Sequence, residues 1–465
     1  MKMALVSGDG LPVSGLLTIF RNVVDLGRRE GLIELPVPAD LGYSWRPDKP
    51  AFYPSGGEGQ IYPEWLSVVD AVPAGDPEWF AAEITEIRNL VATAEKLSDE
   101  ERAALRDRIE AVSGPYEDHF SRWFDEHDVD WVCAVNMTLS DAVPVTLALH
   151  RAAARRWSGE RPGGLLFWDH DLFASSSVYE GDLRVYPLAP NEFTPVPGAY
   201  AGQRWAVVAE GLAKDAATYP TTLVPDLVPN ILPEVPAGLA ERHHEFLAQQ
   251  GLEPGRPIVL CPVRVFRVKG VEIAVSLLAE LSRVTEQRGE PAPYLLVFGS
   301  LGEDPEYTGD VLGTAAREGV SNAVRFLDGV PLSSYPDSSG QWHLDEIDLL
   351  RVCAASGGGV FFTPNRPDVE TVGLGPALAA VAGVPCATTA YRVFDEVYGD
   401  DFGQVQVTVD DLNGAAQEFA GQLAALGRRD PMLLDLLAAN HRRVLHRFSP
   451  APWRELLRLM TQETR

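Results

Sequence analysis

Residues 258–281 read IVLCPVRVFRVKGVEIAVSLLAEL, and this stretch decides the fold. The short apolar run 258–261 predicts a buried strand, and the apolar spacing of 271–287 predicts an amphipathic helix. Between them lies a loop that carries Arg264 and Lys269 and ends at Gly270. A strand that leads through a loop into a helix is the repeating unit of a parallel α/β sheet.

The same alternation runs along most of the chain. Further strands are predicted at 3–7, 131–135, 164–168, 294–298, 323–326, 359–363 and 385–388. Helices are predicted at 16–29, 144–156, 375–382, 415–426 and 431–447, with a largely helical stretch at 76–128 that begins with a Ser98/Glu101 capping box. The predicted fold class is therefore α/β, with two Rossmann-like domains whose parallel sheets face a central cleft.

The length of 465 residues also favours two domains, because single hydrophobic cores stop growing near about 250–300 residues. The proline-dense stretch 220–236 predicts a linker. We expect one domain over 1–225 and a second over 226–447. A final helix within 448–465 is expected to pack back on the first domain.

Composition narrows the class of partner. The formal charge of -27 disfavours nucleic acid and anionic membranes, since both are bound through clustered Lys and Arg. The start of the chain lacks the pattern of a secretory signal, and no run of about eighteen apolar residues occurs. The cysteines lie in apolar segments without paired spacing, which indicates reduced core thiols in the cytoplasm, with a catalytic cysteine as the alternative. They are Cys133, Cys261, Cys353 and Cys386.

Two loops carry residues suited to binding a diphosphate. On the first, Arg264 can contact phosphate with a forked guanidinium and Lys269 with a compact charge. The second, 364–376, runs from a strand into a helix, whose free amides attract anions. Its glycines would let the backbone approach a ligand, and Glu370 would accept hydrogen bonds from sugar hydroxyls. The alternatives are a solvated turn and an ordinary strand-to-helix connection.

These residues resemble the retaining glycosyltransferases of family four, which have the GT-B fold. The resemblance is carried by the R-x-x-x-x-K-G pattern of Arg264 and Lys269, by Val228-Pro229-Asn230 at the domain junction, and by the strand at 323–327. It implies that the first domain binds the acceptor and the second the nucleotide-sugar donor.

The resemblance also assigns individual roles. The family has two glutamates eight positions apart. Glu370 matches the one that contacts the donor sugar, whereas Leu378 stands where the ribose-binding one is expected. His170 matches a histidine that positions the sugar, with a plain structural histidine as the alternative. Asp169-His170-Asp171 also mimics a metal-binding D-x-D motif, although the surrounding pattern is of the metal-free type. The remaining donor-binding residues implied are Ser14, Gly15, Gly299, Val372, Gly373 and Leu374.

The predicted activity is a metal-independent, retaining transfer of a sugar from a UDP- or GDP-type donor to a small acceptor, without a further cofactor. The sequence does not identify the acceptor, for which a specialised metabolite is one candidate, and a homodimer is left open. The alternatives are a related GT-B phosphorylase, epimerase or pseudo-glycosyltransferase, and a degenerate nucleotide-sugar-binding helper motivated by Leu378. His243-His244 is interpreted as solvated surface, and residues 41–65 as an acceptor-binding loop or a packed insert.

Overall fold

The computed structural model describes residues 1–9, 15–43, 62–69, 73–159, 161–173, 179–180 and 183–464. The chain divides into two compact units. Unit 1 comprises Met1–Asn230 with Pro450–Arg465, and unit 2 comprises Ile231–Ser449. The division falls inside the proline-dense stretch. Each unit is described by itself.

Unit 1 is built on a sheet of seven described strands in the order β3-β2-β1-β4-β5-β8-β9. Every neighbouring pair of strands in it is parallel. Trp131 of β4 lies opposite Met3 of β1 on one side and opposite Gly164 of β5 on the other. The strands are β1 (Met3–Ser7), β2 (Val37–Leu41), β3 (Leu66–Val68), β4 (Trp131–Val135), β5 (Gly164–Asp169), β8 (Gln203–Val207) and β9 (Asp226–Leu227). A separate small hairpin joins β6 (Tyr179–Glu180) to β7 (Leu183–Arg184).

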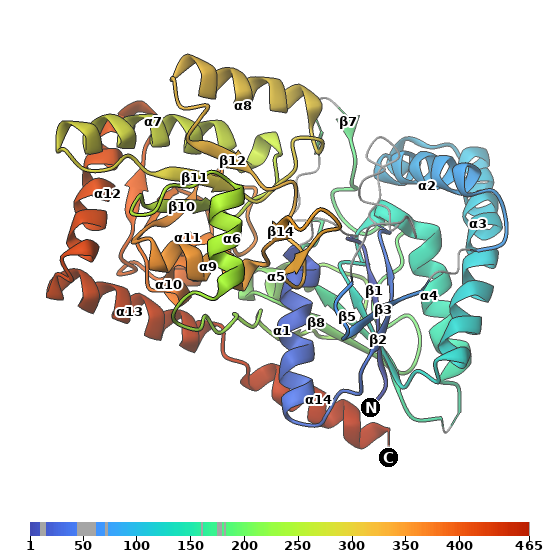
Figure 1. Cartoon of the computed structure of the whole chain (residues 1–465). Helices are drawn as coiled ribbons and strands as arrows, with labels where there is room; N and C mark the ends of the chain where they lie inside the picture. Colours follow the sequence, from blue (N-terminus) through green and yellow to red (C-terminus); the bar gives the residue numbers. More distant parts are fainter. Residues whose placement is uncertain are drawn as a thin grey trace. The chain divides into compact units, whose positions relative to one another are not determined.

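Helices cover both faces of this sheet, as expected where parallel strands are buried on both sides. Figure 1 shows α1 on one face and α3 with α4 on the other. The helices are α1 (Gly15–Arg29), α2 (Pro77–Ala92), α3 (Asp99–Glu126), α4 (Val143–Arg156), α5 (Glu210–Ala216) and α14 (Ala451–Glu463). The predicted capping box at the start of α3 is confirmed, since Ser98 and Glu101 exchange side-chain and backbone hydrogen bonds.

The C-terminal helix α14 packs on the rest of unit 1. The Trp453 ring meets Trp168 edge to face at 4.7 Å, and the Trp131 indole donates to the Met460 carbonyl at 3.2 Å. Arg458 forms an ion pair at 3.1 Å with Glu30, the residue that directly follows α1. The last residues of the chain are therefore held by aromatic packing against the first sheet.

Unit 2 contains a second parallel sheet of six described strands, in the order β12-β11-β10-β15-β16-β17. The strands are β10 (Ile258–Cys261), β11 (Tyr294–Val297), β12 (Val324–Phe326), β15 (Gly359–Phe362), β16 (Cys386–Thr389) and β17 (Val405–Val407), with a small hairpin of β13 (Tyr335–Pro336) and β14 (Trp342–His343). The helices are α6 (Glu241–Gln249), α7 (Val271–Gln287), α8 (Pro305–Arg317), α9 (Glu346–Ala355), α10 (Gly375–Ala382), α11 (Phe394–Tyr398), α12 (Leu412–Gly427) and α13 (Pro431–Arg447). The α/β prediction with two parallel sheets is confirmed.

The strand order of unit 2 reverses between β10 and β15. In open parallel sheets, ligands bind at the carboxyl ends of the strands next to such a point, which here are β10 and β15. One face of this sheet packs on α6, α9 and α10 through a core cluster that includes Phe246, Leu260, Leu350 and Leu378. Those helices fix the positions of the loops at the sheet edge.

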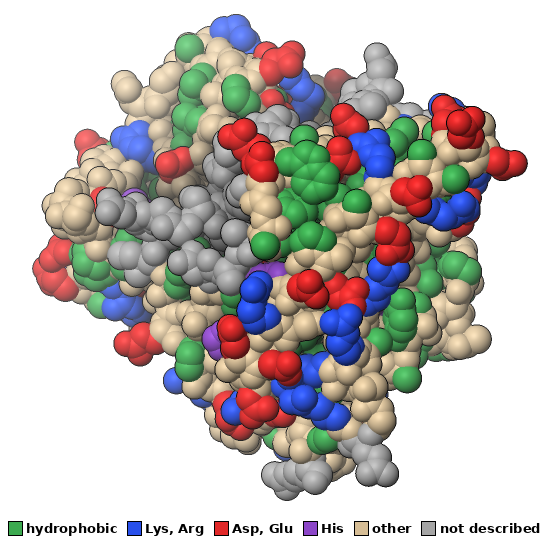
Figure 2. Space-filling model, turned by 90° about the vertical axis from the view of Figure 1, so that its right-hand side faces the viewer, with side chains coloured by type: hydrophobic (Ala, Val, Ile, Leu, Met, Phe, Trp, Pro, Cys, Tyr) green, Lys and Arg blue, Asp and Glu red, His purple; other side chains and the backbone are tan. Residues whose placement is uncertain are grey.

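The charge of the chain is mixed on the side of unit 1 seen in Figure 2, where acidic and basic side chains alternate. Ion pairs account for part of this mixture, such as Arg151 with Glu110 at 2.7 Å and Arg108 with Glu83 at 2.8 Å. Exposed pairs of this kind add little stability. Within the described ranges, no helix combines the length and the apolar character needed to cross a bilayer.

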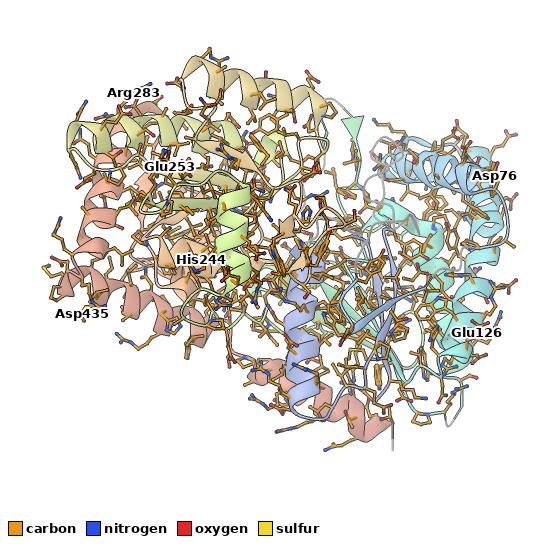
Figure 3. All side chains as sticks on the ribbon, viewed as in Figure 1. Asp76, Glu126, His244, Glu253, Arg283 and Asp435 are labelled. Atoms are coloured by element: carbon orange, nitrogen blue, oxygen red, sulfur yellow. The ribbon has the colours of Figure 1, made fainter. Side chains whose placement is uncertain are left out.

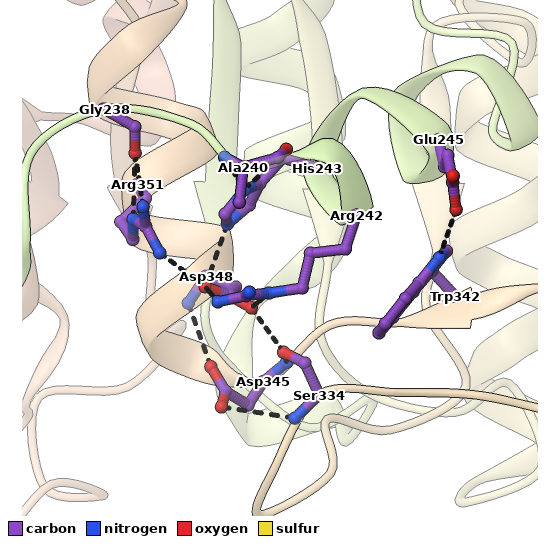
Figure 4. A network of polar contacts seen from close by, with 10 residues as sticks. All are labelled: Gly238, Ala240, Arg242, His243, Glu245, Ser334, Trp342, Asp345, Asp348 and Arg351. Carbon is purple, nitrogen blue, oxygen red and sulfur yellow. Dashed lines mark hydrogen bonds and ion pairs between the residues drawn. The ribbon is translucent and has the colours of Figure 1, made fainter.

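A buried carboxylate joins three segments of unit 2 (Figure 4). Asp348, on α9, accepts two hydrogen bonds from Arg242 (2.6 and 3.0 Å), one from Ser334 (2.6 Å), and shares one with His243 (2.8 Å). Burial alone would raise the pKa of Asp348, but the bonds from Arg242, Ser334 and His243 hold it well below its usual value. The side chain is 4% exposed. Asp348 therefore ties α6, α9 and the β13–β14 segment together.

We expect Asp348→Asn to destabilise the protein by about 2–3 kcal/mol, because the buried His243 and the neighbouring guanidinium lose a charged partner. Thermal unfolding followed by calorimetry measures the loss. Asp435→Asn is the matched control, since Asp435 is exposed on α13 (Figure 3) and its variant should unfold with the unmodified protein. Equal unfolding temperatures for the two variants would contradict this role of Asp348.

Candidate functional site

The residues of the predicted diphosphate site lie at the carboxyl edge of the unit 2 sheet. Arg264 and Lys269 follow β10, Gly299 follows β11, and Glu370 follows β15. Since β10 pairs with both β11 and β15, the three loops leave adjacent strands at one edge. Ligands of open parallel sheets bind at this edge.

Lys269 and Glu370, 101 positions apart in the sequence, form an ion pair in which Nζ donates to Oε1 at 2.7 Å. The side chains are 26% and 10% exposed, so water still reaches the ammonium. A second hydrogen bond also joins the two loops, since the Thr363 side-chain hydroxyl donates to the Gly270 carbonyl at 2.9 Å. The structure thus brings two of the predicted site residues into direct contact.

At Gly270 the backbone of one loop lies close to the backbone of the other. Its φ of 61° is left-handed, and a Cβ added there would lie 1.9 Å from the carbonyl oxygen of Thr363. Both features require glycine. The glycine of the R-x-x-x-x-K-G pattern is therefore explained by the packing of one loop on the other.

Arg264 is held by a residue that the sequence analysis did not single out. Its Nε donates to Oε2 of Glu303 at 3.0 Å, and its guanidinium lies over the Phe266 ring at 4.6 Å. Glu303 is 2% exposed and also accepts a hydrogen bond from the Ser300 amide at 2.8 Å. In the sequence Glu303 is one acidic residue before a helix start. Only its contact with Arg264, which is distant in the sequence, identifies it as part of the site.

Gly299, a predicted donor-binding residue, lies against the Arg264 loop. A Cβ at Gly299 would lie 2.4 Å from the Val265 nitrogen and 2.7 Å from the Arg264 Cα. The close approach that requires glycine here is therefore to the chain's own backbone. Whether Gly299 also contacts a donor stays a prediction.

Val372, Gly373 and Leu374 lead into α10 as predicted, with Pro376 in the first turn. Gly373 has a φ of 71°, and a Cβ there would lie 2.6 Å from the Tyr391 hydroxyl. A Cβ at Gly375 would lie 2.5 Å from the Phe362 ring. Packing against aromatic side chains thus requires both glycines, and backbone approach to a ligand stays a prediction.

Leu378 is 4% exposed and belongs to the core cluster between the sheet and its helices. A side chain in that environment cannot offer a hydrogen bond to a ribose hydroxyl. A glutamate at this position would need a partner for its charge, because an unpaired buried carboxylate is costly. The leucine is therefore accounted for by packing.

His170, in unit 1, follows β5 and is almost fully buried. Its Nε2 contacts Oδ1 of Asn230 at 2.9 Å, and Asn136 Oδ1 accepts from its backbone amide at 2.6 Å. Burial lowers the pKa of His170 to about 4, against the opposing effect of Asp171. The imidazole is therefore neutral, and with Nε2 donating to Asn230 its Nδ1 carries a lone pair.

The two carboxylates of Asp169-His170-Asp171 have different partners. Asp169 is fully buried and accepts from the Trp205 indole at 2.8 Å, whereas Asp171 accepts from the Asn136 side chain at 3.0 Å. Burial raises the pKa of Asp169 to about 7, although the Trp205 indole opposes the rise. In the part of the chain that the structure describes, no three His, Cys, Asp or Glu side chains are grouped to hold a metal ion.

The remaining predictions have mixed outcomes. Ser14 lies outside the described residues, as does most of the 41–65 stretch, and Gly15 begins α1 with open space around it.

The surface interpretation of His243 is wrong, because that ring is fully buried against Asp348, whereas it holds for the exposed His244 (Figure 3). All of the cysteines are free and buried, and burial raises the pKa of each thiol. Reactive thiolates are thus disfavoured.

No protein-family model matches this chain, and no curated protein sequence matches it. Solved structures do resemble it. A glycosyltransferase from Rickettsia africae aligns at 15% identity over 99% of this chain and 98% of its own, with a TM-score of 0.56. Sucrose-phosphate synthase from Thermosynechococcus elongatus aligns at 15% identity over 99% and 98%, with a TM-score of 0.58. HepE from Anabaena, in complex with UDP-glucose, aligns at 12% identity over 99% of each chain, with a TM-score of 0.54. The shared feature is the GT-B fold, which confirms the fold prediction.

The loop contact at Gly270 predicts the effect of adding a methyl group. Gly270→Ala should cost about 2–5 kcal/mol of stability, because left-handed strain is joined by a clash with the Thr363 carbonyl. Gly289→Ala is the matched control at the other end of α7, where φ is 69° and nothing lies near the added Cβ. It should cost only the strain, about 1–2 kcal/mol. Equal losses in denaturant unfolding would show that the loop contact has no energetic weight.

The environment of Asp169 predicts a stability difference that depends on pH. In the folded protein burial raises the pKa of the Asp169 carboxyl from its usual 3.8 to about 7, so the carboxyl keeps its proton up to about that pH. The protonated carboxyl therefore stabilises the folded state most at low pH. This stabilisation is lost as the pH rises from the usual pKa of the carboxyl to its raised pKa in the folded protein. The Asp169→Asn variant has no titrating group at this position. Its unfolding temperature should therefore rise relative to that of the unmodified protein between pH 5 and pH 8. Asp107→Asn, at an exposed site on α3, should show no such trend, and a flat difference for Asp169→Asn would refute the assignment.

Proposed function

We propose that this protein is a glycosyltransferase that takes a sugar from a nucleotide-diphosphate donor, with unit 2 binding the diphosphate. The observation that carries the proposal is the pairing of Lys269 with Glu370 at the sheet edge, on the loop that also bears Arg264. Two cations and a helix start at one edge suit a ligand with concentrated negative charge. The GT-B fold of the chain gives this site a precedent among enzymes that use such donors.

In the proposed reaction the bond between the anomeric carbon and the diphosphate oxygen breaks, and the nucleotide diphosphate leaves with the electron pair. The acceptor oxygen bonds to the anomeric carbon on the same face, and its proton passes to the leaving phosphate. Arg264 and Lys269 stabilise the charge that develops on the leaving group, which is usually the largest catalytic contribution. Retention and independence from metal are parts of this proposal taken from the family resemblance.

Glu370 has a second part in the proposal. Its carboxylate pairs with the Lys269 ammonium at 2.7 Å. A bound diphosphate would compete for the same ammonium, which frees Glu370 to accept hydrogen bonds from the sugar hydroxyls. Exchanging one anion for another keeps the lysine paired throughout, so its charge is not left uncompensated.

The candidates for donor and acceptor come from the resemblance to other glycosyltransferases. HepE structures hold UDP and UDP-glucose, so UDP is the first nucleotide to test and GDP the second. His170 is the candidate in unit 1 for contacting the donor sugar, where its Nδ1 would accept from a hydroxyl. A small molecule is the proposed acceptor.

A second candidate is favoured by Leu378. A leucine buried in the core stands where the resemblance expects the carboxylate that binds the ribose, which favours a helper protein that binds nucleotide sugar without turning it over. Calorimetry with UDP-sugars and GDP-sugars, together with donor-hydrolysis and transfer assays over an acceptor panel, separates the two. Tight binding with neither hydrolysis nor transfer would favour the helper, and the anomeric configuration of any product tests retention.

Arg264→Ala should lower kcat by about 10²–10³-fold, as expected when one group that stabilises developing charge is removed. Arg283→Ala is the control, since that residue lies on α7 in exposed ion pairs with Glu280 and Glu318 and should leave transfer unchanged (Figure 3). Product formation by the Arg264 variant at the unmodified rate would remove the proposal.

A further inference from the structure

Two buried tyrosines lie behind the loop that enters α10. The Tyr398 hydroxyl donates to the Gly373 carbonyl at 2.6 Å. The Tyr391 hydroxyl lies 3.3 Å from the same carbonyl and 3.4 Å from that of Val372. Both side chains are buried, and burial raises the pKa of each phenol well above its usual value, so they stay protonated donors.

A trans peptide unit fixes what these bonds do to the other side of the loop. The C=O and N–H of one planar unit point in opposite directions. The bond from Tyr398 to the Gly373 carbonyl therefore turns the Leu374 N–H away from the tyrosines. The contact of Tyr391 with the Val372 carbonyl does the same for the Gly373 N–H. Within the described residues, neither amide donates a hydrogen bond to another group.

The backbone conformation supports a concave pair of amides. Gly373 is left-handed with a φ of 71°, and Leu374 is right-handed with a φ of -76° and a ψ of -11°. Successive residues of opposite hand bring consecutive N–H groups together into an anion-binding nest. The nest opens directly onto the start of α10, whose dipole has the sign that attracts an anion.

The tyrosines are themselves held firmly. The Arg443 guanidinium, from α13, donates to the Tyr398 carbonyl at 2.8 Å, and the Tyr391, Phe394 and Tyr398 rings pack together within 5.1–5.4 Å. Gly373 has no room for a side chain because a Cβ would meet the Tyr391 hydroxyl at 2.6 Å. The loop thus packs closely against a cluster of buried aromatic side chains.

We propose that Tyr398 and, more weakly, Tyr391 are positioning residues that aim the Gly373 and Leu374 amides at the diphosphate of the donor. This inference rests on the proposed function of unit 2. In this proposal the buried tyrosines do not contact the substrate. They act by holding the carbonyl side of the loop, so that the donor meets amides already oriented rather than ordering them on binding.

The test measures binding of UDP, GDP and their monophosphates by calorimetry, and uses the nucleotide that the unmodified protein prefers. Tyr398→Phe removes one hydroxyl and keeps the ring. It should weaken diphosphate binding about 3- to 10-fold, as expected for one lost hydrogen bond. Binding of the monophosphate should change less, so the ratio of the two affinities falls. Tyr391→Phe should have the same effect in smaller degree, because its contacts are longer.

Tyr294→Phe is the matched control. Tyr294 is a buried tyrosine at the amino end of β11, the edge opposite the site, and its hydroxyl accepts from Arg256 at 2.8 Å. Its variant should keep the affinity ratio even if it loses stability. A diphosphate-to-monophosphate ratio unchanged in both Tyr398→Phe and Tyr391→Phe, while the unmodified protein prefers the diphosphate, would overturn the positioning role. If the unmodified protein shows no preference for the diphosphate, the proposed function itself fails.

Discussion

The approach of the Gly270 backbone to the Thr363 carbonyl is the constraint on which the polar edge of unit 2 depends. Without a side chain at Gly270, the loop after β10 lies directly on the loop after β15, and Lys269 comes within 2.7 Å of Glu370. Each strand-to-helix loop by itself could take many courses. When one loop packs on the other, few of these courses remain possible. The ion pair then adds a polar contact to a geometry that the close backbone packing at Gly270 already restricts.

A second common feature of this edge is that buried side chains hold its loops and side chains in place through hydrogen bonds. Glu303 holds Arg264, Tyr398 holds the Gly373 carbonyl, and Asp348 joins the helices on which one face of the sheet rests. Each supporting group is buried, where its bonds compete little with water and its position varies little. Groups proposed to meet a ligand can then remain partly exposed and still be oriented. Such preorganisation lowers the cost of ordering on binding.

Unit 1 uses buried polar groups differently. Asp169, His170 and Asn136 gather after β4 and β5, where burial raises the pKa of the carboxyl and lowers that of the imidazole. Both shifts favour neutral forms, so the cluster avoids buried charge. Asn136 holds this cluster from a left-handed position with a φ of 53°, a conformation that asparagine tolerates better than most residues.

The sequence by itself determined the alternation of strands and helices, the bounds of elements such as β4, α7 and α13, and the polar loops at the carboxyl ends of strands. Those features follow from local apolar spacing, caps and turn residues, which a short window contains. It did not determine that His243 is buried, that Leu378 fills the core, or that Glu303 and Tyr398 support the site. Tertiary structure decided these, because each depends on a partner brought near by sheet order, and no local pattern records which distant side chain will arrive.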